Sequence, residues 1–311
     1  MKFIKDDEFI LLMEDQYGGK FTTDNLKRLR DVGVQTIVRY PFWSDIETSM
    51  GIYRWDVIDR AIDLTYEAGM KCLFGVYDKP PEYFPDEWYL KTPEGENYTG
   101  KYQERLLSPW QPDGWNYHLD FIERFCHRAS DDDNVMCFRA TTHGAESMYP
   151  HDLRFPYRLD GDYIETMLRV LLEEQGIFYN AHASHELWTC FHHSFDHQGR
   201  AGTEHAEMLY RAMWNEFPDA KHYCISYTQF KRGVQGEVEN LADMKRLGLL
   251  MFAAAEYAEG LPVNTGKAIA QGFRGLVCGP IMNWSKHHKM EDWMYDAFRD
   301  SITRWRTARN V

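Results

Sequence analysis

Short apolar segments alternate with amphipathic helical segments along the chain, and this alternation restricts the possible folds more than any other feature. The apolar segments are nearly continuous runs, which is typical of parallel strands buried on both faces. We expect strands at residues 9–13, 36–38, 72–76, 135–138, 186–191, 223–226, 249–255 and 275–282. We expect helices at residues 24–32 (capped by Thr23 or Asp24), 55–68, 115–127, 162–174, 204–216, 238–247, 263–271 and 290–309.

Eight strand–helix repeats predict the α/β class and, because of their number, a single (β/α)8 TIM barrel. No linker or internal boundary interrupts the pattern, so residues 1–311 are expected to form a single (β/α)8 catalytic domain. A doubly wound open sheet is the alternative fold. Neither a G-x-G-x-x-G after the first strand nor a P-loop motif occurs to support it.

Charge and composition limit the partners. The net charge of −13 repels nucleic acid and anionic membranes, so we expect neither as a partner. The N-terminus lacks an apolar signal core, no run of ~18 apolar residues occurs, and none of the six cysteines forms a C-x-x-C pair. We expect a cytoplasmic protein without metal or cofactor, although a secreted protein that had lost its leader would look the same. The oligomeric state stays open.

Two carboxylates follow expected strands directly. The stretch from Asn134 to Pro150 begins as a buried strand, becomes small and polar, and delivers Glu146. The apolar run 249–255 ends on Glu256, with Glu259 close behind as a competitor. Because barrel enzymes place their catalytic groups at the C-terminal ends of the strands, we expect Glu146 and Glu256 to face each other across one pocket.

Two such carboxylates suit cleavage of a glycosidic bond, in which one acid donates a proton and the other attacks or activates water. Further polar and aromatic residues gather at the strand ends. Each alone has a structural explanation: Arg39 as a rim ion pair, Trp43 and Trp284 as packing, the histidines as solvated loop residues. The set is Glu14, Asp15, Arg39, Trp43, Asp78, His143, His192, His193, Tyr227 and Trp284.

Several motifs resemble glycoside hydrolases. The segment after the second strand is similar to the second β/α unit of clan A enzymes, notably the thermostable-type β-galactosidases. It reads Trp43-x-x-Ile46-Glu47, Gly51-x-Tyr53-x-Trp55-Asp56 and Ala68-Gly69-Met70-Lys71. At the fourth strand, Ala145 stands where clan A enzymes place an Asn before the acid. Gly144-Ala145-Glu146-x-x-Tyr149-Pro150 is instead similar to the acid-bearing segment of the inverting β-amylases.

The resemblance implies a carbohydrate substrate and a role for each residue. Glu146 would be the general acid, and Glu256 the nucleophile or, in an inverting enzyme, the base. Arg39 would lie beneath the nucleophile, Tyr227 would hydrogen-bond it, and Trp284 would form the floor of the sugar site. The remaining expected substrate contacts are Trp43, Asp78, His143 and His193.

The sequence leaves alternatives for the stereochemistry of the reaction and for the class of function. The second-strand unit, Tyr227 and Trp284 favour retention, whereas the fourth-strand motif favours inversion; the balance favours a retaining β-galactosidase-like glycosidase. A catalytically inactive carbohydrate-binding barrel is one alternative. Another is a metal-dependent barrel hydrolase or isomerase using His192 and His193, but it lacks an H-x-H after the first strand. The sugar, the linkage and exo or endo action stay open.

Overall fold

A computed structural model of the chain describes residues 10–15, 21–39, 41–75, 79–92, 94–99, 105–130, 132, 135–139, 161–181, 186–191, 211–226, 250–255, 261–270, 275–278 and 291–309. Its central sheet closes in the order β1-β10-β9-β8-β7-β6-β5-β2, and every neighbouring pair is parallel. The α/β class and the parallel sheet are therefore confirmed. The strands are β1 (Ile10–Asp15), β2 (Thr36–Arg39), β5 (Lys71–Gly75), β6 (Val135–Arg139), β7 (Glu186–Phe191), β8 (Lys221–Ser226), β9 (Leu250–Ala255) and β10 (Gly275–Cys278).

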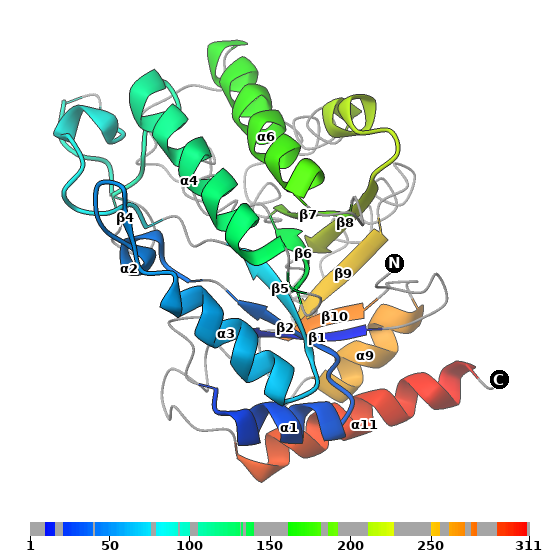
Figure 1. Cartoon of the computed structure of the whole chain (residues 1–311). Coiled ribbons are helices and arrows are strands. Elements are labelled where there is room, and N and C mark those ends of the chain that lie inside the picture. The colour runs from blue at the N-terminus through cyan, green and yellow to red at the C-terminus, as the bar shows by residue number, and fades with distance from the viewer. Residues whose placement is uncertain are drawn as a thin grey trace.

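Helices follow the strands and cover the outside of the sheet (Figure 1). They are α1 (Thr23–Asp31), α3 (Asp56–Glu67), α4 (Pro112–Ser130), α6 (Gly161–Ala181), residues 211–216, α9 (Leu261–Ala270) and α11 (Asp292–Arg309). The helix expected over 238–247 lies outside the described residues, so the full count of eight repeats stays a prediction. Within the described part of the chain, no helix is long and apolar enough to cross a membrane.

The first helix shows how local chemistry sets the element boundaries. Its N-cap is Thr22, not Thr23 or Asp24. The Thr22 hydroxyl accepts a hydrogen bond from the Asn25 backbone N–H, and the Asn25 side-chain oxygen accepts one from the Thr22 backbone N–H. Gly33 follows the helix with φ 104°, a left-handed conformation that suits glycine. A Cβ at Gly33 would lie 2.6 Å from Cγ1 of Ile302, so α11 can pack close to this turn.

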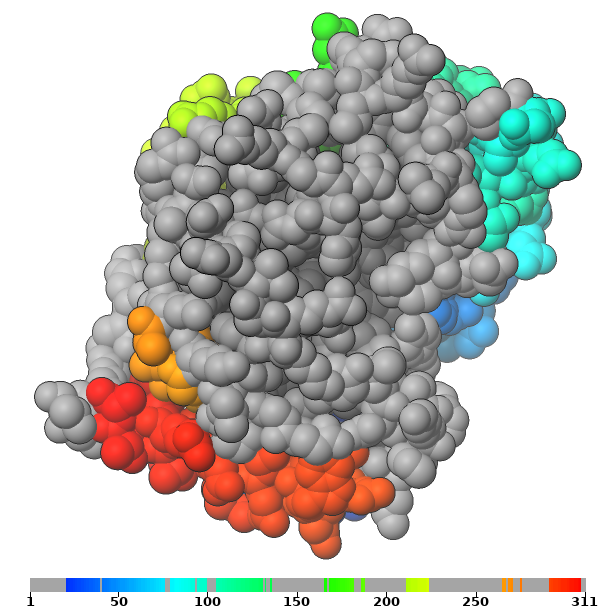
Figure 2. Space-filling view, turned by 180° about the vertical axis from the view of Figure 1, so that it is seen from behind, coloured from blue at the N-terminus to red at the C-terminus, as the bar shows by residue number. Residues whose placement is uncertain are grey.

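The last helix closes the molecule against the first. Arg28 of α1 pairs with Asp292 at 2.5 Å, and its guanidinium carbon lies 3.9 Å from the ring centroid of Tyr295. Asn25 also donates to the Tyr295 hydroxyl at 3.2 Å. From the opposite side, α11 and α9 lie together along one edge of the molecule (Figure 2). Contacts between chain ends thus join the first and last β/α repeats.

Two extensions grow from the C-terminal ends of β2 and β5. The first contains a one-turn helix, α2 (Trp43–Ile46), and the hairpin β3 (Glu47–Ser49) and β4 (Ile52–Tyr53). The second contains the 3₁₀ turn η1 (Asp86–Trp88) and folds back on itself through the bridges Tyr89–Leu107, Lys91–Asn97 and Thr99–Arg105. Neither extension's internal structure was expected from the sequence. Both begin at the barrel end where the expected site lies.

Candidate functional site

The strand topology brings the strand ends that precede the expected site residues to one end of the barrel. Tyr227 and Glu256 directly follow the last residues of β8 and β9, and Glu146 follows β6 in the chain. All strands are parallel, so their C-terminal ends share one rim. In the closed order, β9 and β6 are separated by β8 and β7 on one side and by β10, β1, β2 and β5 on the other. The two acid-bearing segments therefore start from opposing walls.

Most of the expected site residues themselves lie outside the described residues. Of the expected set, the structure describes the side chains of Arg39 and Trp43. The side chains of the other expected residues are not among the described ones: Glu14, Asp15, Asp78, His143, Glu146, His192, His193, Tyr227, Glu256, Glu259 and Trp284. Their roles stay predictions, as does the choice between Glu256 and Glu259.

Arg39 is the last residue of β2 and is buried, with 3% of its surface exposed. Its backbone is in register with Asp15 of β1 and Phe74 of β5. This places a guanidinium in the layer of residues that closes the C-terminal end of the barrel. Buried positive charge in that layer suits the holding of an anionic group.

Trp43 occupies a different environment from the one expected. The side chain is 0% exposed, and its ring stacks on Phe121 of α4 with centroids 4.6 Å apart and an angle of 13° between the planes. Phe84 packs against the same indole edge-on at 5.1 Å. An enclosed ring has no free face on which a sugar could stack. Trp43 is therefore a packing residue, and the expectation that it contacts the substrate is wrong.

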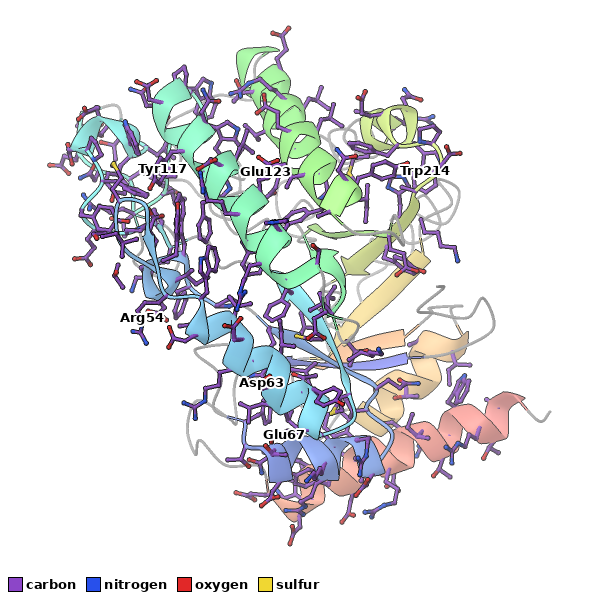
Figure 3. All side chains as sticks on the ribbon, in the orientation of Figure 1. Arg54, Asp63, Glu67, Tyr117, Glu123 and Trp214 are labelled. Atoms are coloured by element: carbon purple, nitrogen blue, oxygen red, sulfur yellow. The ribbon has the colours of Figure 1, made fainter. Side chains whose placement is uncertain are left out.

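Glu47 is the polar centre of this aromatic cluster. Its carboxyl group is fully buried and accepts from Trp43 Nε1 at 2.7 Å, from the Gly51 backbone N–H at 2.8 Å and from the Tyr117 hydroxyl. Tyr117 lies on the side of α4 that faces α2 and β4 (Figure 3). A buried carboxylate needs such donors to offset its desolvation. From the sequence, Glu47 was named as part of a motif but was given no role. Its position four residues after Trp43 was the one sequence feature that could have indicated this hydrogen bond.

Two tyrosines surrounding Glu47 hold their protons firmly. Burial raises the pKa of Tyr117, and its hydrogen bonds to Glu47 and Tyr53 raise the pKa further. Burial also raises the pKa of Tyr83, with the nearby Glu47 carboxyl as a further cause. Both hydroxyls therefore stay protonated, and so remain donors, at ordinary pH.

A second buried carboxyl group lies at the opposite end of the barrel. Glu186 opens β7, is 2% exposed and accepts from the Tyr223 hydroxyl of β8 at 3.3 Å. Burial raises its pKa to about 7, against the lowering effects of Lys221 and Tyr223. Since strand starts form the face of a barrel that serves stability, Glu186 does not belong to the expected active site.

His222, the residue before Tyr223 in β8, is also buried. Its Nε2 lies 3.1 Å from the Phe217 carbonyl oxygen, and its ring stacks on Trp214 with centroids 4.2 Å apart. Burial lowers its pKa, and the Phe217 carbonyl partly opposes this. Figure 3 shows Trp214 beside β8, away from the extensions that carry Trp43 and Glu47. A packing role accounts for this histidine.

A hollow of 580 Å³ lies between α4 and α6 on the outer surface. Its polar lining includes Glu123, His127, Glu173 and Asn180. These residues belong to helices and not to strand ends, so the hollow does not coincide with the expected site. Over the part of the chain that the structure describes, no group of three or more His, Cys, Asp or Glu is arranged to hold a metal ion.

The closed parallel barrel is shared with several solved structures of glycosidases. No protein-family model matches the sequence, and no curated protein is detectably similar to it. Solved structures of glycosidases do match. The catalytic domain of a β-amylase from Paenibacillus polymyxa is similar over 96% of this chain and 98% of its own, with a TM-score of 0.68 and 12% identity.

Two β-galactosidases give similar matches. The enzyme from Halorubrum lacusprofundi aligns with 94% of this chain at a TM-score of 0.64 and 10% identity. The enzyme from Marinomonas ef1 aligns with 94% at 0.65 and 12% identity. This chain spans 57% and 58% of their lengths. The resemblance to β-amylases and β-galactosidases is thus confirmed for the fold, which is all that such low identity shows.

Proposed function

We propose that the chain is a glycoside hydrolase, with Glu146 as the general acid and Glu256 as the second carboxylate. The observation that supports this best is the topology: β6 and β9, which precede the two acids, lie on opposing walls of one barrel. A sugar bound between the walls would have one acid on each side of its glycosidic bond. The full-length likeness in fold to a β-amylase domain adds to this proposal.

In the reaction, Glu146 gives its proton to the leaving glycosidic oxygen while the bond to the anomeric carbon breaks. Glu256 attacks the anomeric carbon in a retaining enzyme, and water then hydrolyses the glycosyl–enzyme bond with Glu146 acting as base. Arg39 keeps Glu256 charged and in place, and Tyr227 donates to it. We place Trp284 as the floor of the sugar site, and Asp78, His143 and His193 as hydroxyl contacts.

The whole chain, residues 1–311, would form one (β/α)8 catalytic domain, with the helix expected over 238–247 completing the repeats. Retention remains our proposal, with a β-galactosidase-like specificity. The extensions after β2 and β5 would shape the subsites, since they start at the same barrel end.

The test is hydrolysis of a panel of aryl glycosides and natural oligosaccharides by the purified wild type, Glu146→Gln and Glu256→Gln. We expect both variants to fold and to lose several orders of magnitude in kcat on unactivated substrates, because each lacks a group that the transition state needs. Asp63→Asn, an exposed change on the outer helix α3, is the matched control. Oligosaccharide binding without hydrolysis by the wild type would indicate an inactive sugar-binding barrel, and activity that a chelator removes would indicate the metal-dependent class.

A further inference from the structure

Two segments that are distant in the sequence, residues 43–51 after β2 and helix α4, meet at the carboxyl group of Glu47. Trp43 starts α2 after β2, Gly51 turns the β3–β4 hairpin, and Tyr117 lies on α4; each donates a hydrogen bond to this carboxyl. Gly51 N–H is also 2.9 Å from the Tyr117 hydroxyl oxygen, which closes the network. We propose that Glu47 is a positioning residue that holds the extensions after β2 and β5 at the catalytic mouth, and this rests on the proposed function.

The network reaches the second extension through two contacts. The Ser44 backbone N–H donates to the Lys79 carbonyl at 3.1 Å, and Lys79 directly follows Asp78, an expected sugar contact. Phe84 packs between Trp43 and Tyr117, with ring centroids at 5.1 and 5.4 Å. Any shift of Trp43 is therefore transmitted to the start and to the middle of the segment that follows β5.

A carboxylate suits this position better than an amide. Three N–H and O–H donors converge on two oxygens, and an ionised carboxyl group offers only acceptors. A glutamine offers one oxygen and one NH₂ group. In either orientation its NH₂ faces at least one of the donors, so a buried polar group loses its partner. Glu47→Gln preserves the volume and removes this match.

The link to catalysis is short. Arg39 is the last residue of β2, and the chain reaches Trp43 after three further residues. Misplacing groups at a reacting centre by about 1 Å costs on the order of a hundredfold in rate. We therefore expect Glu47→Gln to lower kcat/KM by about tenfold or more, with KM rising more than kcat falls, because the anchored residues contact the substrate and do not transfer protons.

The barrel offers a matched control at its other end. Glu186 and Tyr223 form a buried carboxyl–tyrosine hydrogen bond at the strand starts, as Glu47 and Tyr117 do beyond the strand ends. We would compare Glu47→Gln with Glu186→Gln by kinetics on an aryl glycoside at a temperature where both are folded. In parallel, amide hydrogen exchange would follow the backbone N–H groups of Ser44 and Gly51.

Exchange at Ser44 and Gly51 should become about tenfold faster in Glu47→Gln and stay unchanged in Glu186→Gln, since the Gly51 N–H donates to Glu47 itself and the Ser44 N–H adjoins Trp43, which also donates to it. Unchanged exchange in Glu47→Gln, or an equal kinetic loss in Glu186→Gln, would overturn the proposal. Should Glu47→Gln fail to fold, Tyr117→Phe removes a single donor and takes its place in both measurements. Should the wild type hydrolyse nothing, the proposed function fails and the exchange result alone decides whether Glu47 holds the extensions.

Discussion

The buried carboxyl group at the bottom of the barrel should make the stability of the protein fall as pH rises. Burial raises the pKa of Glu186 from its ordinary 4.5 to about 7. Below pH 4.5 the group is protonated in both the folded and the unfolded chain and contributes no pH dependence. Between 4.5 and about 7 the unfolded chain releases this proton while the folded chain keeps it. The folded chain then binds more protons, so the free energy of unfolding decreases with pH.

The size of the effect follows from the pKa difference. One pKa unit corresponds to ~1.36 kcal/mol, so this group should cost the folded state roughly 3 kcal/mol of stability between pH 4.5 and pH 8. Glu186→Gln keeps the volume and an acceptor for the Tyr223 hydroxyl, but it cannot ionise. The variant should match the wild type near pH 4.5 and exceed its stability by up to about 3 kcal/mol at pH 8.

The assay is urea unfolding followed by tryptophan fluorescence at several pH values from 4.5 to 8, for wild type and variant side by side. Titration of other groups contributes equally to both, so the difference between the curves isolates Glu186. Glu87→Gln, exposed in η1, should leave the wild-type curve unchanged. Parallel curves for wild type and Glu186→Gln across the range would refute the reasoning, because they would mean that Glu186 does not titrate between pH 4.5 and 7.

Three further outcomes can be checked. Gly33→Ala should lower the free energy of unfolding by about 2–4 kcal/mol in urea titrations, because its φ is 104° and the new Cβ would clash with Ile302. Gly95→Ala has φ 87° but open space around the Cβ, so it should lower that free energy by only about 1–2 kcal/mol. Equal losses in the two variants would contradict the clash. The pH–rate profile should be bell-shaped and lose its alkaline limb in Glu146→Gln on an activated aryl glycoside; a flat profile would exclude this acid–base pair. NMR of the first-formed product should show the same anomeric configuration as the substrate. The opposite anomer would establish inversion, for which the carboxyl groups of Glu146 and Glu256 would lie roughly 6.5–9.5 Å apart instead of about 5–5.5 Å.

The strands could be predicted because each is a short apolar run, and the structure places β9 and β7 within a residue of the expected bounds. Helix α6 was expected to end at Glu174 but continues to Ala181. Beyond that point Phe178 is 2% exposed and Tyr179 packs on Phe217 at 5.2 Å, so tertiary packing extends the helix past Gly176.

The extensions could not be predicted, because long-range contacts stabilise them. Helix α2 has four residues and no side-chain cap, and β3 and β4 are shorter still. No periodicity is detectable over such lengths. Their stability comes from α4, whose Phe121 and Tyr117 enclose Trp43 and bind Glu47. The buried acid Glu186 was equally invisible, since it reads as the polar first residue of a strand until the barrel closes around it.

The environment of Trp43 also shows that the two sequence resemblances, after the second strand and at the fourth strand, differ in what they say about function. The motif after β2 resembles that of clan A glycosidases, and here its Trp43 and Glu47 are both fully buried and bonded to each other. Such a motif is explained by the need to anchor the extensions at the barrel mouth, and it carries no information about which bond is cleaved. Any inference about the chemistry must therefore rest on Glu146 and Glu256. The motif after β2 supports the fold and the position of the mouth, so the proposal of retention rests on Tyr227 and Trp284, against the fourth-strand segment around Glu146.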